Sequence, residues 1–268
     1  MAEPAPPAAY DPRRFRTTVP FYARYRLAYP PALIARLIEV VGMKPGEAAM
    51  DLGCGPGPIA ILLARAGMKV TAVDPEPEML AAAKAAAGEA GVEIDFRQGS
   101  SFDMPDGMGP FRLVTMGRSF HWMDRPATLR MLDAMIVPGG AVAMLHDDHP
   151  RTAENRWRLI LRDLGNKYGR TASPHVQASG RPDYRNHVSV LMDSAFNRLE
   201  QVGIFIRREI TADDIVGLAF SLSTTAPQKL GAQAAEFEKE LRGALAALSP
   251  EGRFTEIAEL QALIARRG

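Results

Sequence analysis

A cluster of glycines beside an acidic residue lies in the first third of the chain. It reads Asp51-Leu-Gly53-Cys54-Gly55-Pro-Gly57 and follows a short apolar segment, residues 48–51. A helix is expected after it, from about residue 59 to residue 66, because Gly67 would end it. Glycine adopts positive φ and lets a backbone approach a ligand closely, and a helix N-terminus offers unpaired N–H groups. The segment therefore predicts a loop that binds a nucleotide-like ligand.

A second acidic residue, Asp74, ends the next expected strand, residues 69–74. It lies 17 residues after Gly57, where an acidic side chain can accept hydrogen bonds from both hydroxyls of a ribose. The alternative is a tight turn between a strand and a helix that binds nothing. The loop, the helix and the acid together favour a ligand that contains a nucleoside.

Two classes of nucleotide ligand fit a glycine loop, and the neighbouring residues distinguish them. A dinucleotide-binding loop has the pattern G-x-G-x-x-G, which leaves room for a pyrophosphate at the helix start. This chain has G-x-G-x-G, with Asp51 before it and Pro58 after it. Asp51 would repel a pyrophosphate but could pair with an ammonium group. The loop thus favours a ligand with a cationic amino-acid group over a dinucleotide.

Strands and helices alternate along the first 150 residues. Strands are expected at residues 48–51, 69–74, 93–97, 111–116 and 141–145. The helix before the last of these is expected to end in Val137-Pro-Gly-Gly140. This alternation predicts an α/β fold with a parallel sheet covered by helices on both faces. Beyond residue 150 the pattern loosens, with helices expected at 151–168, 212–222 and 232–247 and strands at 197–208 and 255–265.

The order and spacing of these segments resemble the class I S-adenosylmethionine-dependent methyltransferases. Asp51–Gly57 is similar to the first motif of that family, and the resemblance continues through Val73-Asp74-Pro75 with Met79-Leu80, Phe111–Val114 and Val137–Gly140. It covers about residues 20–150, and the tail is similar to the branch of trans-aconitate and ubiquinone-type methyltransferases. The resemblance implies a Rossmann-like fold with a seven-stranded, mostly parallel sheet, an antiparallel last strand and a helical lid.

The resemblance also implies how S-adenosylmethionine would bind as the cofactor. The backbone from Gly53 through Cys54 and Gly55 to Gly57 would line its methionine part, with Asp51 near the amino group. Asp74 would accept hydrogen bonds from the ribose. Two further residues, Pro75 and Met79, would pack near the adenine.

Ser100, Ser101 and Phe102 lie where the family often has Gly-Asp-Ala. Ser100 thus replaces an Asp that frequently meets the adenine amine. Tyr25 and Arg26, with Tyr22 just before them, belong to an Arg-Tyr-Arg-x-x-Tyr-Pro segment that is similar to the family's N-terminal lid. There Arg26 would meet the cofactor carboxylate. The alternative is a surface helix whose Tyr rings pack on the core.

Two histidines are candidate general bases for the acceptor, because both follow strands whose carboxyl ends meet at one edge of the sheet. His121 lies in Gly117-Arg-Ser-Phe-His-Trp122 and resembles the family's His-Trp or His-His pair. Alternatively, His121 would line the pocket as a hydrogen-bonded residue without acting as a base. Trp122 would pack against the cofactor or the core. His146 opens the run His146-Asp-Asp-His149, whose alternating side chains cannot all converge on one metal ion. No metal site is therefore expected.

Basic residues near this edge suit an anionic acceptor. Arg118 is a candidate contact for the cofactor as well as for an acceptor carboxylate, because a guanidinium can clamp a carboxylate with two hydrogen bonds; facing water is the alternative. Further candidates lie in the basic stretch 151–208, namely Arg156, Arg158, His175, Arg181, Arg185 and His187.

Composition excludes several classes of protein. The 268 residues carry a net charge of +1, which argues against non-specific nucleic-acid binding, and the one cysteine excludes a disulfide framework. No apolar run reaches the roughly 18 residues of a membrane helix, and the N-terminus lacks the pattern of a signal peptide, so a cytoplasmic protein is expected. The expected division is a disordered tail at 1–20, a cofactor-binding core at 21–150, and a part at 151–268 that completes the sheet and forms a substrate lid.

The sequence thus predicts an enzyme that moves a methyl group from S-adenosylmethionine to an oxygen, nitrogen or carbon of a small organic, anionic acceptor. Nucleic acid and membrane are not expected partners, and the chain would be a monomer or a homodimer. A non-catalytic S-adenosylmethionine-binding or regulatory protein is the alternative from another class. An NAD(P)-dependent oxidoreductase is the alternative among enzymes, disfavoured by the glycine spacing.

Overall fold

The computed structural model describes residues 24–169, 184–222 and 224–268. The expected N-terminal tail lies outside these ranges, as do Tyr22, His175 and Arg181.

A seven-stranded mixed sheet forms the centre of the fold, in the order β3-β2-β1-β4-β5-β7-β6. β1 to β5 pair in parallel, and β7 runs antiparallel to both β5 and β6. The expected α/β fold with an antiparallel last strand is confirmed. The strands are β1 (Ala48–Leu52), β2 (Lys69–Asp74), β3 (Asp95–Gln98), β4 (Phe111–Gly117), β5 (Ile136–Asp148), β6 (Arg198–Thr211) and β7 (Arg253–Arg266).

Helices cover both faces of the sheet. One face packs against α2 (Pro31–Val41), α3 (Pro58–Arg65) and α4 (Pro77–Ala90), and the other against α5 (Arg125–Met135) and α8 (His187–Met192). Successive side chains of a strand point to opposite faces. In β5, Ala143 and Leu145 accordingly face the first helical layer, while Val142 and Met144 face the second.

Local sequence explains how the β1–α3 turn is built. Apolar residues bury β1 almost completely, and Gly57 caps α3 with φ +80°, in the left-handed region that glycine adopts without strain. Pro58 then opens the helix, where its missing N–H costs nothing. The turn therefore points the first N–H groups of α3 at the carboxyl edge of the sheet.

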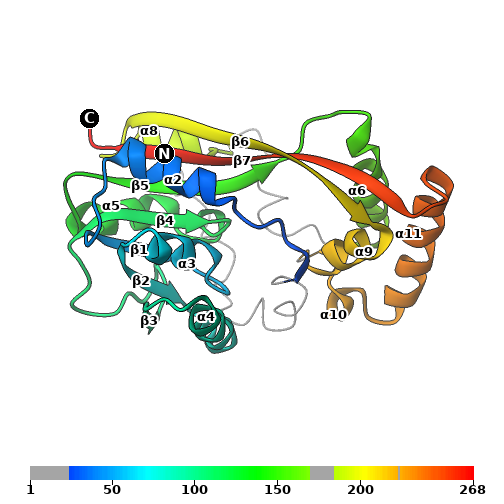
Figure 1. Cartoon of the computed structure of the whole chain (residues 1–268), viewed down its shortest axis with the longest axis horizontal. Helices are drawn as coiled ribbons and strands as arrows, with labels where there is room; N and C mark the ends of the chain where they lie inside the picture. The colour runs from blue at the N-terminus through cyan, green and yellow to red at the C-terminus, as the bar shows by residue number, and fades with distance from the viewer. Residues whose placement is uncertain (1–23, 170–183, 223) are drawn as a thin grey trace, which may run out of the picture.

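A helical lobe with its own apolar core lies at one end of the molecule (Figure 1). It contains α6 (Trp157–Tyr168), α9 (Ala212–Phe220), α10 (Pro227–Leu230) and α11 (Ala234–Leu248). β6 and β7 pair over all 14 residues of each strand, whereas β5 pairs with β7 only over Ala141–Asp148. The β6–β7 hairpin thus extends past the rest of the sheet and carries the lobe. Short 3-10 turns are η1 (Phe120–Trp122), η2 (Glu154–Arg156) and η3 (Gly231–Gln233).

Several element boundaries differ from those expected. The segment Val137–Gly140 does not end a helix: α5 ends at Met135, and β5 begins at Ile136 because Ile136 pairs with Phe111 before a register shift. β3 begins at Asp95 rather than at residue 93. The helix expected over 151–168 is η2 followed by α6, since Pro150 precedes it and the first helical turn forms only from Glu154.

Candidate functional site

The glycine loop turns sharply at the carboxyl end of β1. Gly53, Gly55 and Gly57 have φ of +71°, +54° and +80°. The N–H groups of Gly53 and Cys54 both donate to the carbonyl oxygen of Val73, which fixes the loop to β2. A Cβ on Gly53 would lie 2.6 Å from Cβ of Ser119, whereas a Cβ on Gly55 meets no described atom within 4 Å. The loop is thus packed on one side and open at Gly55.

Asp51 is a buried carboxyl group beneath this loop, with 1% of its surface exposed. Its Oδ1 accepts a hydrogen bond from the Thr115 hydroxyl at 2.8 Å, while its Oδ2 has no partner among the described residues. Burial raises the pKa of Asp51 to about 7 although the Thr115 hydroxyl and the nearby Ala60 N–H oppose the rise, and the negative charge of Asp74 adds to it. A cation at Oδ2 would stabilise the ionised form, so the site is suited to an ammonium group.

Asp74 ends β2 on the other side of the loop. Its Oδ2 accepts from the Gly55 N–H at 2.8 Å and its Oδ1 from the Glu76 N–H at 3.0 Å. Burial raises the pKa of Asp74, although these two hydrogen bonds oppose the rise. A carboxylate has about four acceptor positions, so Asp74 can still accept from ligand hydroxyls.

Cys54 lies between the two acids. Burial and the charges of Asp74 and Asp51 raise the pKa of its thiol well above the ordinary value. The thiol is therefore protonated and inert at neutral pH, and it serves packing rather than nucleophilic chemistry.

The residues expected near the adenine lie around Asp74. Gly99 N–H donates to the carbonyl oxygen of Asp74, which brings the Ser100 turn to the end of β2. Ser100 is buried, and its Oγ accepts from the N–H groups of Phe102 and Asp103. Met79 is buried, Pro75 and Ser101 are partly exposed, and the Phe102 side chain is 44% exposed. The structure therefore gathers these residues beside Asp74, with the Ser100 oxygen used to hold its own turn.

Arg118 directly follows β4, and its backbone is in the left-handed region, with φ +54°. Its Nε donates to Oδ1 of Asp147 at 2.5 Å and its Nη2 to the carbonyl oxygen of Leu27 at 2.9 Å. The guanidinium also lies 4.7 Å from the centre of the Tyr29 ring. With 11% of its side chain exposed, Arg118 does not face water, and the carboxylate that it binds belongs to its own chain.

The N-terminal segment bridges the lobe and the core. Tyr25 packs its ring against Gly217 of α9, and Arg26 Nη2 donates to the Ser221 carbonyl oxygen at 3.3 Å. Farther along, the Tyr29 hydroxyl donates to the carbonyl oxygen of Leu145 at 3.2 Å. The structure thus places Tyr25 and Arg26 in contact with the lobe, and their expected contact with the cofactor stays a prediction.

The two candidate bases lie at the ends of neighbouring strands. His121 belongs to η1, which begins three residues after the end of β4, and its ring centre lies 4.7 Å from that of Trp122. His146 lies one residue after Leu145, which pairs with Gly117 of β4. By alternation His146 faces the same side as Met144, the side covered by α5 and α8. Both histidines are partly exposed at the carboxyl edge.

A charged cluster joins the core to the lobe, and sequence reasoning did not find it. His149 Nε2 lies 3.0 Å from Oε1 of the buried Glu256, and its Nδ1 lies 3.7 Å from Oδ2 of Asp147. Glu256 also binds Arg208 at 2.7 Å and Arg158 at 3.4 Å. Burial works to raise the pKa of Glu256, but the hydrogen bond from His149 and the charge of Arg208 outweigh it and leave the pKa lowered. Among the described residues, no three His, Cys, Asp or Glu side chains are arranged to hold a metal ion.

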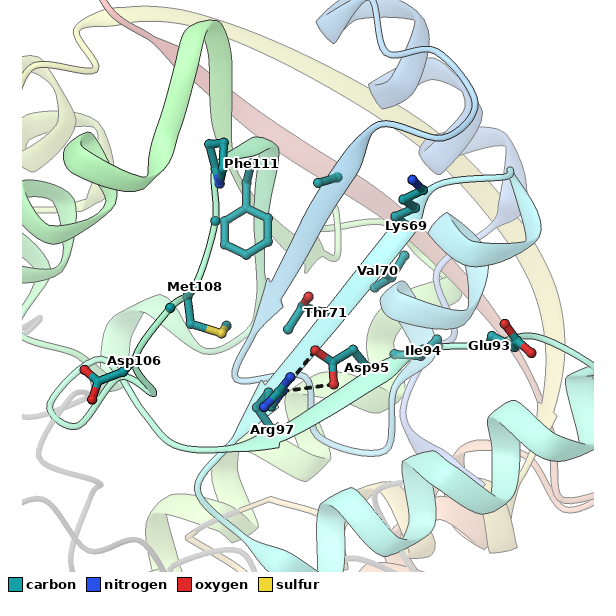
Figure 2. A pocket seen from close by; sticks show the side chains of 14 residues that line it. Lys69, Val70, Thr71, Glu93, Ile94, Asp95, Arg97, Asp106, Met108 and Phe111 are labelled. Atoms are coloured by element: carbon teal, nitrogen blue, oxygen red, sulfur yellow. Dashed lines mark hydrogen bonds and ion pairs between the residues drawn. The ribbon is translucent and has the colours of Figure 1, made fainter.

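A groove of about 570 Å³ lies elsewhere, and Figure 2 shows its lining from the starts of β1 and β2, from β3 and from residues 106–111. Lys69 and Ala48 are the first residues of their strands, so this groove is at the opposite edge of the sheet from the glycine loop. It is not the site that the two acids form.

In the described part of the chain, no helix is long and apolar enough to cross a membrane.

Comparison with known proteins agrees with this geometry. A family profile described as a methyltransferase domain matches residues 49–140, which contain both acids and the glycine loop. An uncharacterized methyltransferase from Synechocystis is 30% identical over 147 residues, 48% of this chain and 67% of that protein. An uncharacterized methyltransferase from Mycobacterium tuberculosis is 28% identical over 160 residues, 60% of each chain, so this chain spans about 60% of its length.

The fold has a counterpart among solved structures. A putative type II methyltransferase from Anaeromyxobacter dehalogenans superposes with a TM-score of 0.62 at 20% identity, covering 90% of this chain and 97% of that one. That structural similarity supports the fold alone, whereas the family profile and the relatives named above are similar in sequence. Together with the acids and the loop at the carboxyl edge, they show that the chain belongs to the class I S-adenosylmethionine-dependent methyltransferases.

Proposed function

We propose that the chain transfers the methyl group of S-adenosylmethionine to an oxygen, nitrogen or carbon of a small anionic organic acceptor. The observation that carries the proposal is the buried Asp51 carboxyl group, whose Oδ2 has no described partner and lies beneath a loop open at Gly55. A dinucleotide brings a pyrophosphate to a glycine loop, whereas S-adenosylmethionine brings an ammonium group that can donate to this oxygen. The residues present therefore fit the cofactor of the family.

The residues of the site then have distinct tasks. When bound, the cofactor supplies an electrophilic methyl group on a sulfonium. Asp51 would accept from the ammonium group, and the Gly53–Gly57 backbone would line the methionine part. Asp74 would hold the ribose hydroxyls, because two backbone N–H groups fix its carboxylate in place. Orienting two reactants in line supplies much of the rate of such a displacement.

An acceptor atom that carries a proton, such as a hydroxyl oxygen or an amine nitrogen, loses it when it gains the methyl group. We propose His121 or His146 as the group that receives this proton, since both lie at the carboxyl edge where the acceptor would enter. Replacing each by alanine separately should reduce kcat by about 10²-fold for the histidine that acts as the base. Trp122→Phe is the control next to His121. Unchanged turnover in both histidine variants would contradict the base and leave the methyl transfer standing.

The cofactor is tested by calorimetric titration with S-adenosylhomocysteine, S-adenosylmethionine and NADH. Micromolar binding of the first two is expected, and Asp74→Asn should weaken it at least tenfold. Asp95→Asn is the matched control, because Asp95 is exposed on β3 and lines the groove at the opposite edge. Binding of NADH alone would contradict the proposal. Cofactor binding with no transfer to any anionic metabolite tested would favour a regulatory binding protein.

A further inference from the structure

The outer edge of β6 is a long stretch of backbone with which no described strand pairs, because β6 ends the strand order. The neighbouring strand β7, paired on both sides, has nine buried positions among its 14 residues, whereas β6 has one. An edge strand of this length is a template for pairing with another chain. Charged side chains usually prevent such pairing, so their positions along β6 matter.

The centre of β6 carries no charge. The six residues 201–206 read Gln-Val-Gly-Ile-Phe-Ile, with Glu200 before them and Arg207 and Arg208 after them. Phe205 is 64% exposed, and Gly203 beside it is also exposed. Val202, Ile204 and Ile206 face the side of α2, where they are only partly buried. This segment is uncharged and apolar with oppositely charged ends, which is the pattern of a strand that pairs with its own copy.

We propose that two copies of the chain pair antiparallel along β6, with Ile204 opposite Ile204, so that the two sheets form one continuous sheet. In an antiparallel pair, directly opposed residues carry their side chains on the same face of the sheet. A two-fold axis therefore requires a residue at the centre to oppose its own copy. This condition leaves only a few registers within the uncharged segment.

The register centred on Ile204 gives more favourable side-chain contacts between the copies than the registers centred on Gly203 or Phe205. It places Glu200 opposite Arg208, Val202 opposite Ile206, and Phe205 over Gly203, each contact occurring twice. Centring on Gly203 would oppose Arg198 to Arg208, which repel, and centring on Phe205 would oppose Val202 to Arg208. Charge complementarity thus selects Ile204.

The oligomeric state of the full chain tests the proposal. Sedimentation velocity over a concentration series should show a species of twice 29.2 kDa. Glu200→Arg should weaken the dimer about tenfold or more, because it creates two repulsive pairs with Arg208. Glu209→Arg is the matched control: Glu209 lies on the same strand in a similar exposed pair, with Arg253, but would oppose Leu199. Phe205→Lys should also weaken the dimer. The fold should be preserved, because residue 205 pairs with Glu259 of β7 and a lysine there would face an opposite charge.

A crosslink tests the register. Under mild oxidation Ile204→Cys should form a disulfide between copies, and Val202→Cys should not, because only position 204 opposes itself. A monomer at every concentration would overturn the proposal. A dimer unaffected by Glu200→Arg and Phe205→Lys, or one crosslinked better at 202 than at 204, would overturn it as well, since another surface or register would then hold the copies.

Discussion

The Thr115 hydroxyl donates to Oδ1 of Asp51 at 2.8 Å across the β1–β4 pair, in which these two residues are directly opposed. The hydroxyl occupies one carboxyl oxygen and leaves the other, Oδ2, without a described partner. Thr115 is itself fully buried, so the hydrogen bond orients the carboxyl group from within the sheet. Thr115 of β4 thus binds Oδ1 of Asp51 and leaves Oδ2 as the oxygen that a ligand can contact.

Asp51 should make the ligand-free protein less stable as the pH rises. Its pKa is about 7 in the folded chain and 3.8 ordinarily, so between these values the folded state holds a proton that the unfolded state has lost. The free energy of unfolding should therefore fall between about pH 4 and pH 7, by on the order of 4 kcal/mol. Asp51→Asn should remove most of this slope, as measured by urea unfolding across that range. An unchanged slope would contradict the raised pKa.

Cofactor binding should release a proton from Asp51 near neutral pH. An ammonium group at Oδ2 would lower the pKa of the carboxyl group, so the bound form would be ionised where the free form is partly protonated. Calorimetric titration with S-adenosylhomocysteine at pH 6.5 in two buffers of different ionisation enthalpy measures the release. About half a proton or more is expected, and Asp51→Asn should abolish it. Equal heats in both buffers for the unaltered protein would exclude the proposed contact.

Arg118 should matter for stability through both its charge and its backbone. Arg118→Ala would leave Asp147, which is largely buried, without the guanidinium, and we expect a loss of about 3 kcal/mol. Arg118→Gly should be more stable than Arg118→Ala by about 1 kcal/mol, because φ of +54° strains alanine and not glycine. Arg97→Ala, at an exposed ion pair, is the control and should change little. The reverse order of the two Arg118 variants would refute the backbone argument.

Gly217 should be intolerant of a side chain although it lies in a helix. A Cβ there would collide with the Tyr25 ring, so Gly217→Ala should cost about 1–3 kcal/mol. Gly243 in α11 has no described neighbour within 4 Å of its Cβ position, and Gly243→Ala should stabilise by about 0.5–1 kcal/mol. Calorimetric melting compares the two. In a Tyr25→Ala background, Gly217→Ala should no longer lower the melting temperature. If it still does, the added methyl group collides with a residue other than Tyr25.

The sequence was sufficient for the half of the fold that forms the glycine loop. The apolar runs and the glycines of residues 48–74 predicted two strands, the turn and both acids, because each signal is local. The role of Thr115 was not predictable, since it depends on the register between β1 and β4, and Thr115 lies 64 residues from Asp51 in the sequence. Likewise His149 and Glu256 are 107 residues apart, and no local pattern pairs them. The roles of the site residues toward a ligand stay predictions.

The lobe segment between β6 and β7 begins and ends at one paired position. Thr211 pairs with Arg253, and the N–H of Ala212 donates to the carbonyl oxygen of Gly252. The 41 residues 212–252 are therefore an insertion whose two ends are already joined by the hairpin. A change within this segment therefore leaves the register of β6 and β7 unaltered, provided that it keeps the packing of α9 on Tyr25 and of α11 on α6. On the function proposed here, acceptor preference can then diversify while the methyl donor stays the same.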